Sequence, residues 1–422
     1  MSIFLNKKIL IYGSGRSGLS TSKFLKNKGD VFLYDDFKKN LTKSTTQRFI
    51  IKNQFDFIII SPGIDINKCK LSWFLRKNLD KIYTDLDVFY SFYKNDCISI
   101  TGTNGKSTTC RLLYEILSKH NYDVKLVGNI GEPILSVKNV KSNTIFVVEV
   151  SSYQLEYSKI FKSKYAAILN ISPDHLERHK TIDNYVRAKF KILNNNLKNS
   201  LGFINKKDLL TIKECKKRKL KRKILKVNTR LLSQIQKKID NNYFVDEANK
   251  ENLSFVIAIS NELKLKKKIV FDTLKGFKGL KYRQQIIYKK NLLTIINDSK
   301  STSFSSSVSI LKKKSNIYWL LGGIPKKGDK FILNKKYHSN IKAFIYGDNK
   351  KFFNSQLEGK IQYSNFNNLS DALKKVFMTI NKENSLKKTI FFSPSAASFD
   401  SFKNFEDRGH YFNKLVKKHL NE

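Results

Sequence analysis

The residues with the clearest chemical potential form a glycine-rich turn, ITGTNGKSTT, at residues 100–109. Gly102 and Gly105 allow the backbone to turn tightly, and the free N–H groups of a following helix can then approach a polyphosphate. Lys106 supplies a positive charge, and the hydroxyl of Ser107 can ligate Mg²⁺. The pattern therefore predicts a site for a nucleoside triphosphate.

The spacing of this motif is shorter than in the usual P-loop pattern, which has four residues between its first Gly and the Gly-Lys pair. Only Thr103 and Asn104 lie between Gly102 and Gly105. An ordinary strand-to-helix turn with an exposed lysine is the alternative. The context favours the phosphate site, because an apolar run, CISI, precedes the motif and a segment with helical periodicity follows it.

Two further polar residues are expected at the same edge of a sheet. Glu149 ends a buried strand, TIFVVEV, and His175 follows another, YAAILNI. The carboxyl ends of strands face the ligand crevice in an open α/β sheet. Glu149 is thus a candidate Mg²⁺ ligand, usually through water. It could instead, or in addition, cap a helix that begins near Ser151. His175 is a candidate metal or phosphate contact, whereas His179 is expected to be exposed.

A second glycine motif lies near the N-terminus. A strand, KILIYG, is followed by Gly13, Gly15 and Gly18 in GxGxxG spacing. Asp35 ends the next strand, VFLYDD, where a carboxylate can bind a ribose. This motif alone is a weak signal, and its ligand could be a dinucleotide, a uridine nucleotide or nothing.

Strands and helices alternate along the chain, so we expect an α/β protein with three domains. Residues 1–92 are expected to form a Rossmann-like domain, and residues 93–279 a P-loop ATPase-like domain with a mainly parallel sheet. Residues 280–422 are expected to form a second Rossmann-like domain. Its turns DSKSTS, GGIPKKGDK and SPSAASFD should meet at one edge, where they suggest a second substrate site. Each of them alone is typical of a surface turn.

Composition narrows the class of protein. A chain of 422 residues with 41% hydrophobic residues can bury several cores. No run of eighteen apolar residues occurs, and the N-terminus leads directly into a strand, so we expect a soluble cytoplasmic protein without membrane insertion. The four cysteines lack CxxC spacing, which argues against a disulfide framework or a zinc site.

The formal net charge of +45 would, by itself, favour a partner such as nucleic acid. Lysine is spread through the whole chain, however, together with Asn, Ile, Phe and Tyr, a set enriched by A+T-rich codons. We interpret the charge as coding bias and expect no specific nucleic-acid partner. The densest basic run, residues 216–226, is expected to be solvated loop or edge-strand lysines.

The ordered set of motifs resembles the Mur ligases of peptidoglycan synthesis over nearly the whole chain. It comprises TGTNGKST, GNIG with VVEVSSYQLE, SPDHLERH with YVRAKFKI, NDSKSTS, LGGIPKKGDK and SPSAASFDSFKNFEDRG. SPSAASFD favours the branch of this family that adds D-glutamate. The resemblance implies a cytoplasmic, monomeric enzyme that uses ATP to join D-glutamate to UDP-N-acetylmuramoyl-L-alanine. An acyl phosphate would form first, and ADP and phosphate would be released.

The resemblance also implies catalytic and metal-binding roles. Lys106 would neutralise the transferring phosphate, Ser107 and Glu149 would hold a first Mg²⁺, and His175 would belong to a second. Lys189 matches a lysine that this family carbamylates, which turns a cation into an oxygen-donor anion suited to Mg²⁺. Judged by composition alone, Lys189 would be a snorkelling side chain.

The same resemblance assigns residues to the three substrates. The residues implied for ATP are Gly102, Thr103, Asn104, Gly105, Lys106, Ser107, Thr108, Asn249, Asn252, Arg283 and Asp298. Those implied for the UDP substrate are Ser14, Gly15, Arg16, Ser17, Asp35, Asn129, Ser151 and Gln154. Those implied for D-glutamate are Lys300, Thr302, Lys326, Ser398 and Phe399. Two lysines suit a substrate with two carboxylates.

Two departures from the family pattern and three alternatives stay open. Ala248 stands where relatives often have histidine, and the common HRxE is replaced by the sequence YRQQ at residues 282–285. A sister ligase for another amino acid is one alternative, although a DNPR-type motif is absent. A folylpolyglutamate synthetase-like enzyme is the second, and the N-terminal glycine motif argues against it. The third, from another class, is a P-loop ATPase stimulated by nucleic acid.

Overall fold

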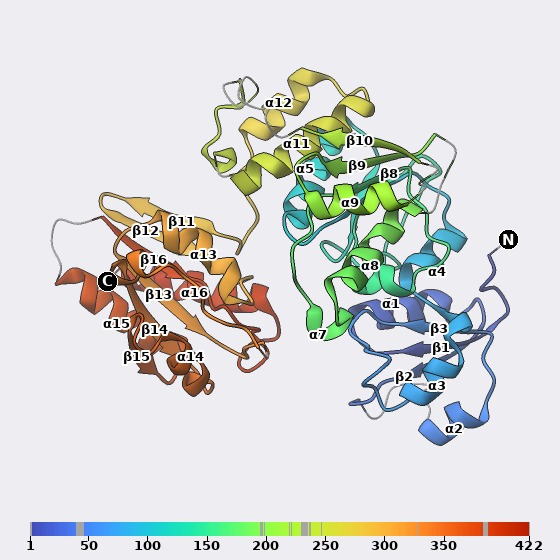
Figure 1. Cartoon of the computed structure of the whole chain (residues 1–422), viewed down its shortest axis with the longest axis horizontal. Helices are drawn as coiled ribbons and strands as arrows, with labels where there is room; N and C mark the ends of the chain where they lie inside the picture. The colour runs from blue at the N-terminus through green and yellow to red at the C-terminus, as the bar shows by residue number, and fades with distance from the viewer. Residues whose placement is uncertain are drawn as a thin grey trace. The chain divides into compact units, whose positions relative to one another are not determined.

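The computed structural model describes residues 2–38, 46–194, 197, 199–218, 220, 222–228, 235, 238–245, 247–326, 328–382 and 387–421. The chain divides into two compact units, Met1–Phe277 and Lys278–Glu422. Figure 1 shows that the first unit holds two sheets and the second unit holds one, each flanked by helices. No helix in these described segments has the length and apolar content needed to cross a membrane.

The first sheet has four parallel strands in the order β2-β1-β3-β4. Its strands are β1 (Lys8–Tyr12), β2 (Asp30–Tyr34), β3 (Phe57–Ile60) and β4 (Ile82–Tyr83), and its helices are α1 (Arg16–Leu25), α2 (Gln47–Lys52), α3 (Ser72–Lys77) and α4 (Asp85–Phe92). The strands are apolar runs because helices cover the sheet. A Cβ on Gly18 would lie 1.8 Å from the carbonyl oxygen of Gly13, so only glycine lets α1 start this close to β1.

The second sheet has six parallel strands in the order β10-β9-β8-β5-β7-β6. The strands are β5 (Cys97–Thr101), β6 (Val124–Gly128), β7 (Ile145–Glu149), β8 (Tyr165–Ile168), β9 (Leu201–Asn205) and β10 (Lys223–Val227). The helices are α5 (Lys106–Lys119), α6 (Ser152–Tyr157), α7 (Leu176–His179), α8 (Ile182–Asn194), α9 (Leu209–Lys217), α11 (Glu247–Glu262) and α12 (Lys267–Lys275). Because β10 is an edge strand, the edge-strand interpretation of the basic run is confirmed for Lys223 and Lys226. It is wrong for Lys216 and Lys217, which lie in α9, and Arg222 is buried and not solvated.

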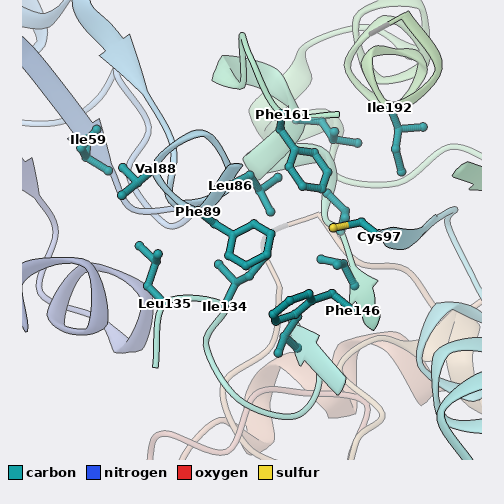
Figure 2. Close-up of a cluster of buried hydrophobic side chains, with 14 of the residues drawn as sticks. Ile59, Leu86, Val88, Phe89, Cys97, Ile134, Leu135, Phe146, Phe161 and Ile192 are labelled. Atoms are coloured by element: carbon teal, nitrogen blue, oxygen red, sulfur yellow. The ribbon is translucent and has the colours of Figure 1, made fainter. Parts of the chain in front are cut away.

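The first two sheets share a hydrophobic core, and α4 provides the contact. Figure 2 shows Leu86 and Phe89 of this helix among Phe146 and Phe161, which belong to the second sheet and its connections. The rings of Phe89 and Phe146 lie 4.8 Å apart at 71°. This shared core explains why residues 1–277 form a single compact unit. The expected domain boundaries at 92/93 and 279/280 stay predictions.

The third sheet has the order β11-β12-β16-β13-β14-β15, and β11 is antiparallel to its neighbour, whereas the other pairs are parallel. The strands are β11 (Gln285–Lys290), β12 (Leu293–Asn297), β13 (Ile317–Gly322), β14 (Ile341–Tyr346), β15 (Gln362–Phe366) and β16 (Lys388–Phe392). The helices are α13 (Phe304–Lys313), α14 (Lys350–Leu357), α15 (Leu369–Asn381) and α16 (Phe405–Asn421). The expected three-part α/β class is confirmed by these sheets.

The four cysteines are free thiols, as expected from their spacing. Cys97 and Cys110 are buried, and Cys69 and Cys215 are partly exposed. Burial raises the pKa of the Cys215 thiol, which makes this residue a poor nucleophile at neutral pH. The cysteines are therefore packing residues.

Candidate active site

The glycine turn at residues 102–105 connects β5 to the N-terminus of α5. Gly102 and Gly105 have backbone φ angles of 154° and 82°, values that residues with a side chain rarely adopt. A Cβ on Gly105 would lie 1.9 Å from Oδ1 of Asn252, a buried residue of α11. The sequence prediction of a strand, a tight glycine turn and a helix is therefore confirmed, and the turn brings Asn252 against the loop.

Lys106 lies over this loop. Its Nζ donates hydrogen bonds to the carbonyl oxygens of Gly102 and Thr103, both at 2.8 Å. The side chain is half-buried, unlike the exposed lysine of the alternative interpretation. The ammonium of Lys106 and the N-terminal end of the α5 dipole give the loop a positive potential suited to phosphate.

Ser107 and Glu149 lie side by side beneath the loop. Ser107 Oγ donates to Oε2 of Glu149 at 2.6 Å, and Asn129 Nδ2 donates to Oε1 at 2.8 Å. Glu149 is buried at the carboxyl end of β7. The alternative that Glu149 caps a helix is wrong, because Ser151 caps α6 in a capping box with Gln154.

Lys189 reaches the same loop from α8. The side chain is only 1% exposed, and its Nζ donates to the carbonyl oxygen of Gly102 at 2.8 Å. Snorkelling toward solvent is therefore wrong for this lysine. Burial, and then the charge of Lys106, hold the pKa of Lys189 well below its usual value. The Tyr185 ring lies 4.6 Å from the same nitrogen.

His175 precedes α7 and has a positive φ of 56°. Its Nδ1 lies 2.9 Å from the hydroxyl of Tyr153, in α6. Asp174 and Glu177 are also close, with contacts of 3.4 and 3.5 Å to the imidazole. Tyr153 is a neighbour that sequence reasoning missed, and its place in a helix directly after Glu149 was the available signal.

The prediction that His179 is exposed is wrong. This residue is buried, and its Nε2 lies 3.0 Å from Ser152 Oγ. Its ring stacks on Tyr153, with centroids 5.6 Å apart. Burial, followed by the charge of Arg178, lowers the pKa of His179 to about 4. The short helix α7 turns the residue inward, which a pattern of four residues cannot reveal.

The donors at this site suit magnesium. A serine hydroxyl and a carboxylate are hard oxygen ligands, and Mg²⁺ commonly binds one or two carboxylates together with water and substrate phosphates. Across the described residues, no three His, Cys, Asp or Glu side chains form a preformed metal cluster. Ser107 and Glu149 therefore fit a magnesium ion whose other ligands come from water and from the phosphates of a nucleotide.

Part of the set implied for the UDP substrate lies in the N-terminal glycine motif at residues 13–18. Ser14 donates to Oδ2 of Asp35 through its N–H at 2.7 Å and its hydroxyl at 2.8 Å, so Asp35 holds this loop. Burial alone raises the pKa of Asp35, but hydrogen bonds from the Ser14 and Phe37 N–H groups outweigh it and lower the pKa. Gly15 caps α1, and Arg16 Nη2 donates to the Gly131 carbonyl at 3.3 Å.

The other members of this set follow β6 and β7, and a buried carboxyl group connects Gln154 to the N-terminal glycine motif. Gln154 Nε2 contacts Oδ1 of Asp85 at 3.2 Å, and Ser17 Oγ donates to Oδ2 of the same residue. Asn129 is held by Glu149, as described above. Asp85 was missed by the sequence analysis. The sequence TDLD at residues 84–87, a capping box, marked the helix start but not this contact.

The remaining residues implied for ATP in the first unit surround the loop. The Asn104 N–H donates to Oδ1 of Asn170 at 2.9 Å, and Thr103 Oγ1 lies 3.2 Å from the Tyr185 hydroxyl. Thr108 Oγ1 lies 3.5 Å from the hydroxyl of Tyr243. Asn249 Nδ2 donates to the Tyr243 carbonyl at 2.9 Å. The side chain of Ala248, one of the two departures, lies outside the described residues.

Asp298 and Arg283 lie in the C-terminal unit. The carboxylate of Asp298 accepts hydrogen bonds from the Gln284 N–H at 3.1 Å and from Ser393 Oγ at 3.0 Å. Its burial raises the pKa of Asp298 to about 7. The second departure is structurally accommodated, because Gln285 Oε1 accepts the Tyr282 N–H at 3.0 Å.

The residues implied for D-glutamate follow three adjacent strands. β12, β16 and β13 are parallel neighbours, so their carboxyl-end turns share one edge, which confirms this part of the prediction. Ile324 and Ala397 exchange backbone hydrogen bonds of 2.9 Å, joining two of the turns. The residues on these turns are Lys300, Thr302, Lys326, Ser398 and Phe399. Ser398 is buried, whereas Phe399 is 71% exposed.

Comparison with known proteins gives consistent matches. The model of the Mur ligase middle domain matches residues 100–270. A UDP-N-acetylmuramoylalanine--D-glutamate ligase of Rickettsia felis is 33% identical and covers 100% of this chain and 99% of its own length. The enzyme of the same name from Francisella tularensis subsp. tularensis is 34% identical, covering 97% of this chain and 95% of the relative.

A solved structure supports the fold. The MurF ligase of Thermotoga maritima, in complex with ADP, aligns with a TM-score of 0.56 at 14% identity, over 99% of this chain and 100% of that one. Three sheets flanked by helices, with a glycine-rich phosphate loop in the second, thus define a protein with the fold of the Mur ligases. The chain belongs to the Mur ligase family and, within it, to the group of UDP-N-acetylmuramoylalanine--D-glutamate ligases.

Proposed function

We propose that this chain is an ATP-dependent ligase that joins D-glutamate to UDP-N-acetylmuramoyl-L-alanine in peptidoglycan synthesis. The observation that carries the proposal is the match over the whole chain to relatives with this activity in their name. The phosphate-binding loop with the Ser107–Glu149 pair beneath it supports the ATP-dependent step. We also propose that the enzyme acts in the cytoplasm as a monomer.

The proposed reaction has two chemical steps. The carboxylate of UDP-N-acetylmuramoyl-L-alanine attacks the γ-phosphorus of ATP, giving an acyl phosphate and ADP. The amine of D-glutamate then attacks the acyl carbon, and phosphate leaves as the amide forms. Positioning and charge neutralisation supply most of the rate in such transfers. Lys106 and the N–H groups at the start of α5 would bind the phosphates.

Ser107 and Glu149 would hold the first Mg²⁺, and His175 with a carbamylated Lys189 would hold a second. When bound, Mg²⁺ would neutralise charge on the phosphate oxygens. Lys189 is buried against the loop, and its lowered pKa favours the neutral amine that can react with carbon dioxide. Tyr153 would hold the His175 ring through the 2.9 Å contact.

In the C-terminal unit, Lys300 and Lys326 would bind the two carboxylates of D-glutamate, with Thr302, Ser398 and Phe399 around them. Both lysines lie on turns that follow parallel strands, β12 for Lys300 and β13 for Lys326, and these strands flank β16. Asn249, Asn252, Arg283 and Asp298 would contact the nucleotide. For UDP-N-acetylmuramoyl-L-alanine, the loop of residues 14–17 together with Asp35 would bind the UDP moiety. The residues nearer the sugar and its peptide arm would be Asn129, Ser151 and Gln154.

Phosphate release with ATP, Mg²⁺ and UDP-N-acetylmuramoyl-L-alanine tests the proposal. D-glutamate should support release, whereas L-glutamate, L-lysine and meso-diaminopimelate should not. Release with another amino acid would assign the chain to a sister ligase and refute the D-glutamate specificity. ATP hydrolysis that only nucleic acid stimulates would refute the ligase itself. Light scattering after gel filtration measures the molar mass in solution, and a value near the 49.0 kDa of one chain would support the monomer.

A further inference from the structure

Asp85, the first residue of α4, is a buried carboxylate with partners on two other helices. It is 4% exposed. Its Oδ2 accepts the hydroxyl of Ser17, in the first turn of α1. Gln154 Nε2, from α6, lies 3.2 Å from Oδ1 and 3.3 Å from Oδ2. Burying a polar group is costly unless it is hydrogen-bonded, and these contacts offset the cost of burying the Asp85 carboxyl.

The fold does not need this contact in order to attach α4 to the second sheet. Asp87, two residues further, accepts the N–H groups of residues 159–161 at 2.9, 2.8 and 3.1 Å and the Ser158 hydroxyl at 3.0 Å. Leu86 and Phe89 add the shared apolar core seen in Figure 2. Asp87 and the apolar core thus attach α4 to the second sheet, whereas Asp85 contacts side chains on α1 and α6.

Both partners of Asp85 belong to the set implied for the UDP substrate. Ser17 lies on the glycine loop at the end of β1, and Gln154 follows β7 in the second sheet. We propose that Asp85 is a positioning residue of the UDP-substrate site, fixing the loop for the nucleotide relative to the helix beside the sugar and peptide arm. This inference rests on the proposed function.

Replacing such a residue should raise the KM for the UDP substrate more than the KM for ATP or D-glutamate. Without Asp85, Ser17 and Gln154 lose a shared carboxyl acceptor, and the two halves of the UDP site can shift relative to each other. Leaving the Ser17 hydroxyl and the Gln154 amide without this acceptor should raise the KM for the UDP substrate about tenfold. The KM values for ATP and D-glutamate should stay within about twofold, because the side-chain hydrogen bonds of Asp85 within the described part of the first unit go to Ser17, Gln154 and the Leu86 N–H and not to the phosphate loop.

The test compares Asp85→Ala, Asp85→Asn and the matched control Asp87→Asn in the full chain. We expect Asp85→Ala to raise the KM for UDP-N-acetylmuramoyl-L-alanine and to weaken binding of UDP measured by calorimetry. Asp85→Asn keeps an acceptor for Gln154 and should lie between Asp85→Ala and the unmodified chain. Asp87→Asn should lower the melting temperature with little change in this KM.

A double variant tests whether Asp85 acts through Ser17. Ser17→Ala combined with Asp85→Ala should raise the KM by less than the product of the two single effects, because the variants remove the same contact. Equal losses for all three substrates, or multiplicative effects, would overturn the inference and leave the ligase assignment intact. An unmodified chain that neither binds UDP nor forms the amide would overturn the proposed function and the inference together.

Discussion

Replacing Gly105 with alanine tests the structural basis of the nucleotide loop. The φ of 82° costs a residue with a side chain about 1–2 kcal/mol. The new Cβ would also lie 1.9 Å from Oδ1 of Asn252, so this buried amide must move. Displacing a buried polar group costs about 1–3 kcal/mol. The two effects together predict a loss of about 3 kcal/mol in the free energy of unfolding and a fall of roughly 5 °C in the melting temperature of the unit Met1–Phe277.

Differential scanning fluorimetry measures the stability, and titration with a fluorescent ATP analogue measures the affinity, which should fall at least about tenfold if the loop opens. Gly63→Ala is the matched control, since no atom lies within 4 Å of its added Cβ. Gly105→Ala with Asn252→Ala should recover the part of the loss caused by the clash and keep the part caused by φ. Wild-type stability and affinity in Gly105→Ala would refute the reasoning.

Further predictions concern three buried ionisable residues. Glu149→Gln should fold normally but lower turnover by about a hundredfold or more, because it removes the proposed metal ligand; unchanged activity at limiting Mg²⁺ would contradict this. Lys189→Ala should abolish turnover, and short carboxylates should restore part of it; full activity without them would remove Lys189 from the mechanism. Burial raises the pKa of Asp298 from 3.8 to about 7, so the native state keeps a proton that the unfolded chain loses. Stability of the C-terminal unit should therefore fall as pH rises from about 4 to about 7, with a smaller slope in Asp298→Asn, measured by denaturation followed through Trp319 with Trp73 replaced by phenylalanine.

The sequence alone determined the order of the chemical motifs and the fold class. The glycine turn before Lys106 was identifiable because a strand, a tight turn and a helix are local features with strong residue preferences. Glu149 was located correctly because the carboxyl end of a buried strand is visible in the apolar run that precedes it. The common edge of the three C-terminal turns followed from the direction of parallel strands.

Tertiary structure decided which side chains meet. The sequence predicted that His179 is exposed and, by composition alone, that Lys189 snorkels toward solvent. Both residues are buried instead, Lys189 against the Gly102 carbonyl and His179 beside Ser152. No periodicity in the sequence distinguishes a buried polar residue from an exposed one when the contacts come from another helix. Asp85 is a similar case, because its partners lie on α1 and α6, 68 and 69 residues away in sequence. Local preferences specify the elements, whereas packing between distant elements specifies the site.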